Sequence, residues 1–276
     1  MTGNDLTVVI PNFNKADFIE QCVTSIEEQT VKPAHILIID DASTDDSRSV
    51  IEKLSEKYPD IEPVFSEKNT GVSAVRNRGL TLVKTDYVTF IDADDYYYDR
   101  YKLENEIKLI NTHGDDTIAY SVTAVMMDGS TVPASRLKKS SYYLKGNIRF
   151  SLLTMRKWDS VMRDYIVRCD ALKNAGGYDE SHSLFEDYEL LLKLSEKHRF
   201  YCTGRFGTAY REGNGISKRR QQDHDRIRNE MMEAELQNDG GLYRAAVKSV
   251  KAFNTLKRRT KDLLRNKVLK ERTGVI

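Results

Sequence analysis

The sequence predicts an α/β fold in which helices flank a mostly parallel sheet and a basic helical extension follows it. Short β-branched runs alternate with segments of helical apolar spacing through the first half of the chain. The links between them are short, which is typical of parallel sheets covered on both faces. The charge is uneven: the chain of 276 residues has a net charge of +1, but residues 218–276 carry 16 Lys and Arg against 8 Asp and Glu.

The first half is expected to contain four strands joined by three helices. Each strand is a short run rich in β-branched or aromatic residues, such as LTVVI at 6–10. Each helix repeats its apolar residues at intervals of three and four. The strands are expected at 6–10, 35–40, 61–66 and 87–92, and the helices at 15–29, 45–57 and 71–83.

The alternation loosens after residue 115, and residues 135–165 give no clear pattern. Glycine, asparagine and basic residues accumulate near position 215, which is typical of a loop, and no proline interrupts the chain after that point. We expect a strand at 117–127, a turn at 128–133, a helix at 186–197, a mobile loop at 211–222 and helix from about 223 to near the end.

Composition narrows the class and the location of the protein. With 39% hydrophobic and 31% charged residues, the chain is globular, and its near-zero net charge argues against a dedicated nucleic-acid-binding protein. Three widely spaced cysteines fit a reducing compartment and give no metal-ligand spacing. No secretory signal pattern opens the chain, and no apolar run approaches the ~20 residues that span a bilayer. We therefore expect a cytoplasmic protein, either soluble or peripheral at the inner face of the cell membrane.

Ligands of parallel sheets bind beyond the carboxyl ends of the strands, so the residues after each strand are the candidates. Directly after the first strand comes the segment PNFN. Pro11 is expected to end the strand by removing a hydrogen-bond donor, which leaves Phe13 and Asn14 at its tip. The simpler interpretation is an ordinary turn.

Adjacent carboxylates follow the second strand in the segment DDASTD. Ser43 or Asp45 fits a helix cap, but this does not account for Asp41, which can accept a hydrogen bond from a ligand N–H. In the third helix, expected at 71–83, Arg76 and Arg78 are two residues apart and face different sides. At most one of them is expected to reach the site.

The fourth strand leads into the segment DADD. Asp92 and Asp94 flank one alanine, so in extended geometry their side chains point the same way. Carboxylate oxygens on one side of a strand end suit Mg²⁺ or Mn²⁺, especially when phosphates complete the coordination. A solvated loop is the alternative.

A fifth motif, FEDY, lies at the start of the helix expected at 186–197. Ser183 and Glu186 have the spacing of a capping box, which accounts for Glu186 but not for Asp187. Taken alone, Asp187 fits a structural role better than a catalytic one.

Together and in this order, the motifs resemble the family 2 inverting glycosyltransferases with the GT-A (Rossmann-like) fold. The matching segments are VVIPNFN, IIDDASTD, NTGVSAVRNRG, TFIDADD, GGYDE and FEDYELLLKLS, and the resemblance covers roughly residues 6–215. It implies a GT-A domain over 1–222, with a nucleotide-binding half at 1–115 and an acceptor half at 116–222. Residues 223–276 would form a helical basic C-terminal extension.

The resemblance also implies roles for single residues. Phe13, which stands where many relatives have Tyr, would stack on the uracil, and Asp41 would accept its N3–H. Asp92 would face the ribose or the metal, and Asp94 would hold Mn²⁺ or Mg²⁺ against the diphosphate. The other implied nucleotide-site residues are Pro11, Asn14 and Arg76.

On the acceptor side, Asp187 matches the general base of the family. Glu186, Tyr178 and Asp179 would orient the acceptor. The segment GGYDE, at 176–180, matches the segment that lines the donor-sugar pocket. Residues 210–217 match a flexible loop over the site.

The implied function is transfer of a sugar from a UDP-sugar, with inversion, to a hydroxyl of a glycan or lipid-linked acceptor in cell-surface polysaccharide or glycoconjugate synthesis. Two other functions remain open. An aspartate-nucleophile phosphatase shares the D-x-D pattern but carries it on the first strand of its sheet, whereas here it follows the fourth. A non-catalytic scaffold would have lost one of the acidic motifs, and both are present.

The end of the chain resembles a basic amphipathic helix. Residues 244–276 carry 11 basic and 2 acidic side chains, and apolar residues recur among them at near-helical spacing. Such a helix can lie on an anionic membrane surface. The alternatives are packing on its own domain or on a second copy of the chain.

Overall fold

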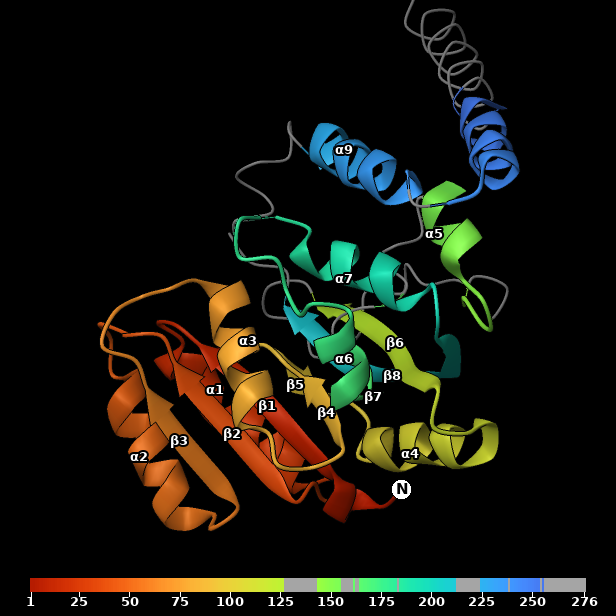
Figure 1. Ribbon diagram of the computed structural model, residues 1–276. Coiled ribbons are helices and arrows are strands. Elements are labelled where there is room, and N and C mark those ends of the chain that lie inside the picture. Colours follow the sequence, from red (N-terminus) through yellow and green to blue (C-terminus); the bar gives the residue numbers. More distant parts are fainter. Residues whose placement is uncertain are drawn as a thin grey trace, which may run out of the picture.

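A computed structural model describes residues 1–126, 143–154, 161, 164–182, 184–211, 224–237, 239–253 and 255 (Figure 1). The strands are β1 Leu6–Asn12, β2 His35–Asp40, β3 Ile61–Phe65, β4 Tyr87–Phe90, β5 Tyr96–Tyr97, β6 Thr117–Met126, β7 Val167–Arg168 and β8 Arg199–Arg211. The helices are η1 Gly3–Asp5, α1 Ala16–Glu27, α2 Ser47–Lys57, α3 Val72–Leu82, α4 Lys102–His113, α5 Arg149–Thr154, α6 Cys169–Asn174, α7 Glu186–Leu194 and α9 His224–Leu236, followed by a helix over 241–253.

The central sheet has the strand order β3-β2-β1-β4-β7, and only β7 is antiparallel to its neighbour. Successive side chains of β1 enter different cores. Val9 belongs to the core that contains Val75 of α3, whereas Val8 and Ile10 belong to the core that contains Ile19 of α1. Helices therefore cover both faces, which confirms the predicted α/β class with a mostly parallel sheet.

β1 runs past the proline that was expected to end it. Pro11 is paired with Ile39 of β2. The carbonyl of Val9 accepts the N–H of Ile91 on the β4 side, so residue 11 also faces β4, beyond the last β1–β4 pair. Proline lacks a backbone N–H, but at position 11 that N–H would face beyond the end of the β1–β4 pairing and would have no partner there. The strand can therefore continue to Asn12.

A second sheet, in the order β5-β8-β6, was not predicted in full. The expected strand at 117–127 is β6, but β8 and the helix α4 went unrecognised. A bulge between Tyr120 and Val122 shifts the β6–β8 register. Beneath this sheet Lys102 of α4 is completely buried and donates to Glu106 (2.8 Å) and to the carbonyl of Asp164 (2.9 Å).

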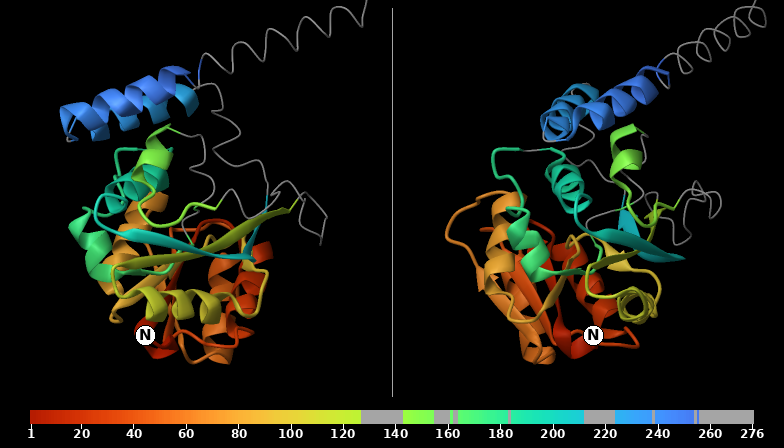
Figure 2. Two further views of the ribbon diagram at one scale, coloured as in Figure 1. Left: turned by 90° about the vertical axis from the view of Figure 1, so that its right-hand side faces the viewer. Right: turned by 45° about the vertical axis from the view of Figure 1, so that its right-hand side comes forward.

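The C-terminal helices pack on the rest of the molecule above α5 and α7 (Figure 2). Met232 and Leu236 of α9 and Val247 of the last helix are buried in the larger core. Arg149 of α5 ties the region together by donating to the Leu192 carbonyl of α7 and to Asp239, both at 2.9 Å. In the part of the chain that the structure describes, no helix is both long and apolar enough to cross a bilayer.

Several sequence predictions fall outside the described residues. The turn at 128–133, the loop from residue 212 onward and the basic segment after residue 255 lie there. Arg211, placed at the start of that loop, is instead the last residue of β8, and Tyr210 of the implied flexible loop is also in the strand.

Candidate active site

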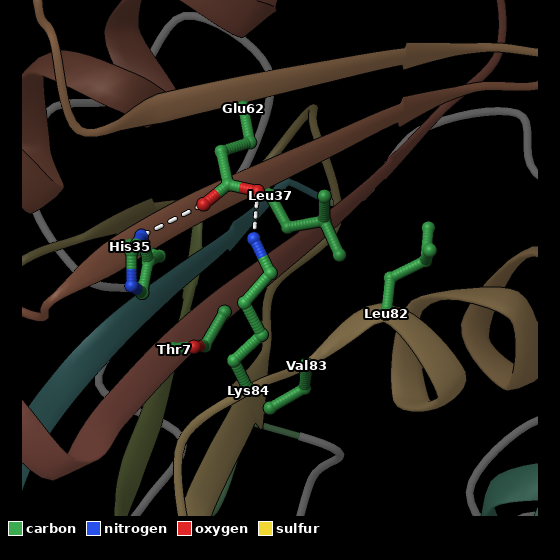
Figure 3. Close-up of a pocket in the computed structure, with 7 residues that line it drawn as sticks. All are labelled: Thr7, His35, Leu37, Glu62, Leu82, Val83 and Lys84. Carbon is green, nitrogen blue, oxygen red and sulfur yellow. Dashed lines mark hydrogen bonds and ion pairs between the residues drawn. The ribbon is translucent and has the colours of Figure 1, made fainter.

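The amino-terminal edge of the central sheet holds only a small cavity (Figure 3). Its volume is about 10 Å³, and Thr7, Leu37 and Lys84 are among its lining residues. Glu62 lies between His35 (2.8 Å) and Lys84 (3.3 Å) there. A space of this size accepts at most about one water molecule, and the sequence motifs gather at the other edge of the sheet.

At the carboxyl-terminal edge, the loops after β1 and β2 are tied to one another. The side-chain oxygen of Asn14 accepts the N–H of Thr44 (2.7 Å), and the N–H of Asn14 donates to the Ser43 hydroxyl (2.8 Å). Phe13 lies between these anchors and β1 with 45% of its surface exposed. An exposed aromatic ring on a firmly held loop is a platform for a flat ligand.

Asp41 connects the β2 loop to the start of α3. Its carboxylate is buried and accepts the N–H groups of Thr70 (2.9 Å) and Gly71 (2.8 Å) as well as the Thr70 hydroxyl (3.0 Å). Three donors leave about one of the four acceptor positions of a carboxylate for a ligand. The role of Asp41 toward a base stays a prediction.

Three aspartates after β4 come together. Carboxylate oxygens of Asp92, Asp94 and Asp95 all lie within 4.8 Å of one another. The route differs from the predicted one: β4 ends at Phe90, and the N–H of Asp95 donates to the carbonyl of Asp92 (2.9 Å), so the segment turns and adds a third carboxylate. Clustered carboxylates are hard oxygen ligands, so the residues present fit Mg²⁺ or Mn²⁺.

The negative charge of this cluster affects the groups next to it. The Cys22 thiol of α1 donates to the carbonyl of Asp92 (3.7 Å), and burial together with the charges of the three aspartates raises its pKa well above the ordinary value. The Lys15 ammonium contacts Asp94 at 2.5 Å. Lys15 was not recognised from the sequence.

Arg76 joins the aspartate cluster to α7. The residue is 1% exposed, and its guanidinium donates to Asp92 (2.8 Å) and to Glu186 (2.9 Å). It also lies over the ring of Tyr178, 5.3 Å from the centroid. Arg78 donates to the Ser66 hydroxyl (2.8 Å), directly after β3. The two arginines therefore contact different parts of the molecule, and that at most one of them reaches the site stays a prediction.

The start of α7 differs from the predicted capping box. The N-cap residue is Phe185, in the left-handed region at φ 64°, and the Phe185 side chain makes no capping hydrogen bond. Glu186 pairs with Arg76 because a buried guanidinium needs carboxylate partners. Ser183 lies outside the described residues. Asp187, in the first turn, is half-buried and accepts the N–H of Tyr188 (2.8 Å).

The GGYDE segment is held against α3 by Asn77, which the sequence reasoning missed. The Asn77 amide accepts the N–H of Tyr178 (2.8 Å) and donates to its carbonyl (2.8 Å). A Cβ on Gly177 would meet the Asn77 oxygen at 2.7 Å, and φ there is +70°. Only glycine allows this approach. The Asp179 carboxylate accepts hydrogen bonds from the hydroxyl and the N–H of Ser181, and these bonds lower the pKa of Asp179.

Arg211 reaches the aspartates from the end of β8. Its backbone N–H donates to Asp95 (3.0 Å), and its guanidinium donates to the Asp94 carbonyl and to Gln21. The guanidinium also lies over the rings of Phe18 and Tyr96. The second sheet thus braces the loop that carries the metal-binding candidates.

Three non-glycine residues adopt positive φ in the described chain, and all lie in loops of this site. They are Asn14 (55°), Ala42 (58°) and Phe185 (64°). Such conformations cost roughly 1–3 kcal/mol each and persist only where surrounding contacts enforce them. Their gathering at one edge supports the assignment of that edge as functional.

Comparison with known proteins extends these observations. The family described as Glycosyl transferase family 2 matches residues 7–173. The uncharacterized glycosyltransferase YibD of Escherichia coli K12 is 28% identical over 176 residues, which are 61% of this chain and 50% of YibD. The amylovoran biosynthesis glycosyltransferase AmsB of Erwinia amylovora is 30% identical over 211 residues, 71% of this chain and 65% of AmsB. This chain thus spans about half to two thirds of these relatives.

Two solved structures share the fold. S. aureus TarS 1–349 in complex with UDP has a TM-score of 0.69 at 21% identity, covering 91% of this chain and 70% of that one. The mannosyltransferase PcManGT from Pyrobaculum calidifontis, in complex with GDP-Man and Mn²⁺, has a TM-score of 0.58 at 18% identity, covering 96% and 80%. The family match ends at residue 173, before α7, whereas the alignment with AmsB covers 71% of the chain and so includes Asp187.

Proposed function

The chain belongs to glycosyltransferase family 2 and has the GT-A fold, and from this premise we propose that it transfers a sugar from a UDP-sugar, with inversion, to a hydroxyl of a glycan or lipid-linked acceptor. The observation that carries the proposal is the Arg76 bridge. It joins Asp92 of the candidate metal cluster to Glu186, the neighbour of the candidate base. Donor-side and acceptor-side carboxylates therefore share one edge of the sheet.

The donor side would bind the nucleotide through the loops after β1 and β2. Phe13 would stack on the uracil, and Asp41 would accept the N3–H with the acceptor position that its three donors leave. Asn14 would act indirectly, by holding the Phe13 loop against Thr44. TarS, which shares the fold, has been solved with UDP and with UDP-GlcNAc, and this supports a uridine nucleotide.

Asp94 and Asp92, with Asp95 beside them, would hold a divalent cation, Mg²⁺ or Mn²⁺. When bound, the cation neutralises the charge that develops on the diphosphate leaving group. The protein contributes by keeping three carboxylates together despite their mutual repulsion. Arg76 and Arg211 hold the segment in place from α3 and from β8.

On the acceptor side, Asp187 would take the proton of the attacking hydroxyl. The acceptor oxygen forms a bond to the anomeric carbon from the face opposite the diphosphate, the bond to UDP breaks, and UDP leaves with the electron pair. A carboxylate in this role contributes typically ~10²–10⁴ in rate. Tyr178 and Asp179 would shape the pocket from the segment that Asn77 clamps.

Because AmsB carries the name of a polysaccharide biosynthesis enzyme, we assign this chain to the same broad process, synthesis of a cell-surface polysaccharide or glycoconjugate. An acceptor of that kind can be lipid-linked, and the C-terminal region would then hold the protein at the inner face of the membrane. Leu242 and Phe253 of the last helix are 91% and 64% exposed and adjoin a basic segment, which supports this contact.

The test separates binding from chemistry. UDP affinity with Mn²⁺ is measured by calorimetry, and UDP release from a panel of UDP-, GDP- and TDP-sugars is measured with the wild type, Asp187→Asn and Glu186→Gln. We expect Asp187→Asn to keep near-normal UDP affinity and to lose roughly two or more orders of magnitude in turnover. Glu186→Gln should affect UDP affinity too, because it removes a partner of the buried Arg76.

Three outcomes would contradict the proposal. A wild type that shows no metal-dependent UDP binding favours the non-catalytic scaffold or the phosphatase. Intact turnover in Asp187→Asn removes that residue as the base. Loss of UDP affinity in Asp187→Asn places the residue in the donor site instead.

A further inference from the structure

The ion pair between Lys15 and Asp94 links the ends of two adjacent strands. Lys15 follows β1, Asp94 follows β4, and the Nζ–Oδ2 distance is 2.5 Å. The Lys15 backbone is fixed: its N–H donates to the Ser47 hydroxyl (3.2 Å), and its carbonyl accepts the Ile19 N–H (3.0 Å) in the first turn of α1. Only the side chain is therefore free to change position.

Lys15 and Arg76, which both form ion pairs with carboxylates of the cluster, differ in how firmly their side chains are held. Arg76 is buried, with its two carboxylate partners on different segments, and its planar guanidinium is fixed by both. The Lys15 side chain is 37% exposed and Asp94 30% exposed. An ammonium on a flexible four-carbon stem, with water at hand to solvate it, can leave its partner at little cost.

The Lys15 ammonium lies where a cation bound by the cluster would compete with it. A cation bound by Asp94 would compete with the ammonium for the same carboxylate, which is one of three whose oxygens lie within 4.8 Å of one another. Without the ammonium, repulsion among three carboxylates would be offset by Arg76 at Asp92 and by backbone donors such as the Arg211 N–H at Asp95.

We propose that Lys15 is an exchangeable counter-ion of this site. In the metal-free protein it neutralises Asp94; when a divalent cation takes that carboxylate, the ammonium turns to the diphosphate of the nucleotide donor and offsets its negative charge. The inference rests on the proposed function. It is supported by the place of Lys15 in the chain. Lys15 lies two residues after Phe13, and its side chain extends from the loop proposed to bind the base to Asp94 of the aspartate cluster.

The first measurement is the affinity of the nucleotide-free protein for Mn²⁺. The electron paramagnetic resonance signal of free Mn²⁺ reports how much of the ion is bound. Removing a competing partly exposed ammonium should strengthen binding by roughly two- to fivefold in Lys15→Met, the scale of such ion pairs. Lys15→Arg should bind Mn²⁺ no more tightly than the wild type. The matched control is Lys84→Met, which removes a lysine paired with Glu62 at the opposite edge of the sheet (Figure 3) and should change nothing.

The second measurement is nucleotide affinity at saturating Mn²⁺, by calorimetry. Lys15→Met should bind UDP about tenfold or more weakly, because a charge-assisted hydrogen bond to phosphate is lost. Binding of UMP, which lacks the β-phosphate, should weaken less, and Lys15→Arg should retain most of the UDP affinity. A lysine with only a structural role would not strengthen Mn²⁺ binding while weakening UDP binding.

The outcomes separate this inference from the proposed function. Unchanged or weaker Mn²⁺ binding in Lys15→Met overturns the counter-ion role, and unchanged UDP affinity overturns the diphosphate contact. If the wild type binds Mn²⁺ and UDP and Lys15→Met matches it, the inference fails and the proposed function stands. If neither protein binds Mn²⁺ or UDP, both fail.

Discussion

Asp94 offers its carboxylate at a partly exposed turn, where the Lys15 ammonium is its close ionic partner. Replacing it removes a candidate metal ligand without opening a cavity in the core. We therefore expect Asp94→Ala to lose Mn²⁺-dependent UDP binding and turnover while its melting temperature stays close to that of the wild type. Calorimetry and thermal unfolding measure the two effects. Asp116→Ala, at an exposed position, is the control, and wild-type turnover by Asp94→Ala with Mn²⁺ would refute the metal assignment.

Substitution of Phe13 tests the proposed binding of the nucleotide base. Stacking of an aromatic ring on a base is worth about 1–3 kcal/mol, so Phe13→Ala should weaken UDP binding by roughly fivefold to a hundredfold. Stability should change little because the ring is exposed. Phe13→Tyr keeps the ring face and serves as the control, with affinity near that of the wild type. Equal UDP affinity for all three proteins would mean that the ring does not contact the base.

Sequence reasoning at the residue scale found the strongly patterned acids and missed their partners. Asp92 and Asp94 were recognised because paired carboxylates at a strand end are unusual, although they converge through a turn. Lys15 was missed because lysine is ordinary at any exposed position. Arg211 was missed because its contacts with the aspartates arise only from the pairing of β8 with β5, which no local pattern records.

At the scale of elements, α4 and the second sheet meet at a buried ion pair. Lys102 and Glu106 are fully buried, and Asp164, which accepts the Thr208 hydroxyl of β8, is 3.7 Å from the Lys102 ammonium. Burial raises the pKa of the Glu106 carboxyl from 4.5 to about 7. An acid whose pKa is higher in the folded protein contributes stability that is fully present below the unfolded value and is lost as pH rises through the folded value.

The window for Glu106 therefore runs from about pH 4.5 to about pH 7. Glu106→Gln cannot ionise at this position, so it does not lose this stability as pH rises. From pH 5 to pH 8, the free energy of unfolding of Glu106→Gln minus that of the wild type should therefore increase by about 2–3 kcal/mol, at roughly 1.4 kcal/mol per pKa unit. Urea unfolding of both proteins at the two pH values measures this. Glu104→Gln, exposed on the same helix, should track the wild type. Parallel pH profiles for Glu106→Gln and the wild type would contradict the assignment.

Elements with clean periodicity were predicted to within a few residues, and those with mixed composition were not. The predicted strand at 35–40 coincides with β2, and the predicted helix at 71–83 differs from α3 by one residue at each end. β8 has two glycines and three arginines in thirteen residues, so its apolar alternation is broken. α4 contains a buried lysine and a buried glutamate, which a hydrophobic pattern assigns to the surface.

At the scale of the whole molecule, the C-terminal helices pack on the core, and by the proposal above they would also contact a membrane surface. Truncation after residue 240 removes Val247 from the core and Tyr243 from its contact with Phe150, so thermal stability should fall. UDP-sugar hydrolysis should remain measurable because the site lies at the sheet edge. Sedimentation with anionic vesicles should weaken, since residues 244–276 carry 11 basic and 2 acidic side chains.

Salt and lipid charge provide the controls for that experiment. Vesicle binding of the full chain should fall as salt rises, because charge attraction is screened over about 8–10 Å at physiological ionic strength. Neutral vesicles should bind both forms weakly. Equal sedimentation of the full and truncated chains with anionic vesicles would remove the membrane role and favour packing on the chain itself or on a second copy.

The Arg76 bridge would make the binding of the two proposed substrates thermodynamically interdependent. One buried guanidinium contacts Asp92 on the donor side and Glu186 on the acceptor side, so a ligand that alters its hold on one carboxylate also alters its hold on the other. Linkage requires such an effect to be reciprocal: the factor by which UDP changes acceptor affinity equals the factor by which the acceptor changes UDP affinity. If Asp92 and Glu186 face the donor and the acceptor as proposed, a single side chain would couple the binding of two unlike ligands within one domain.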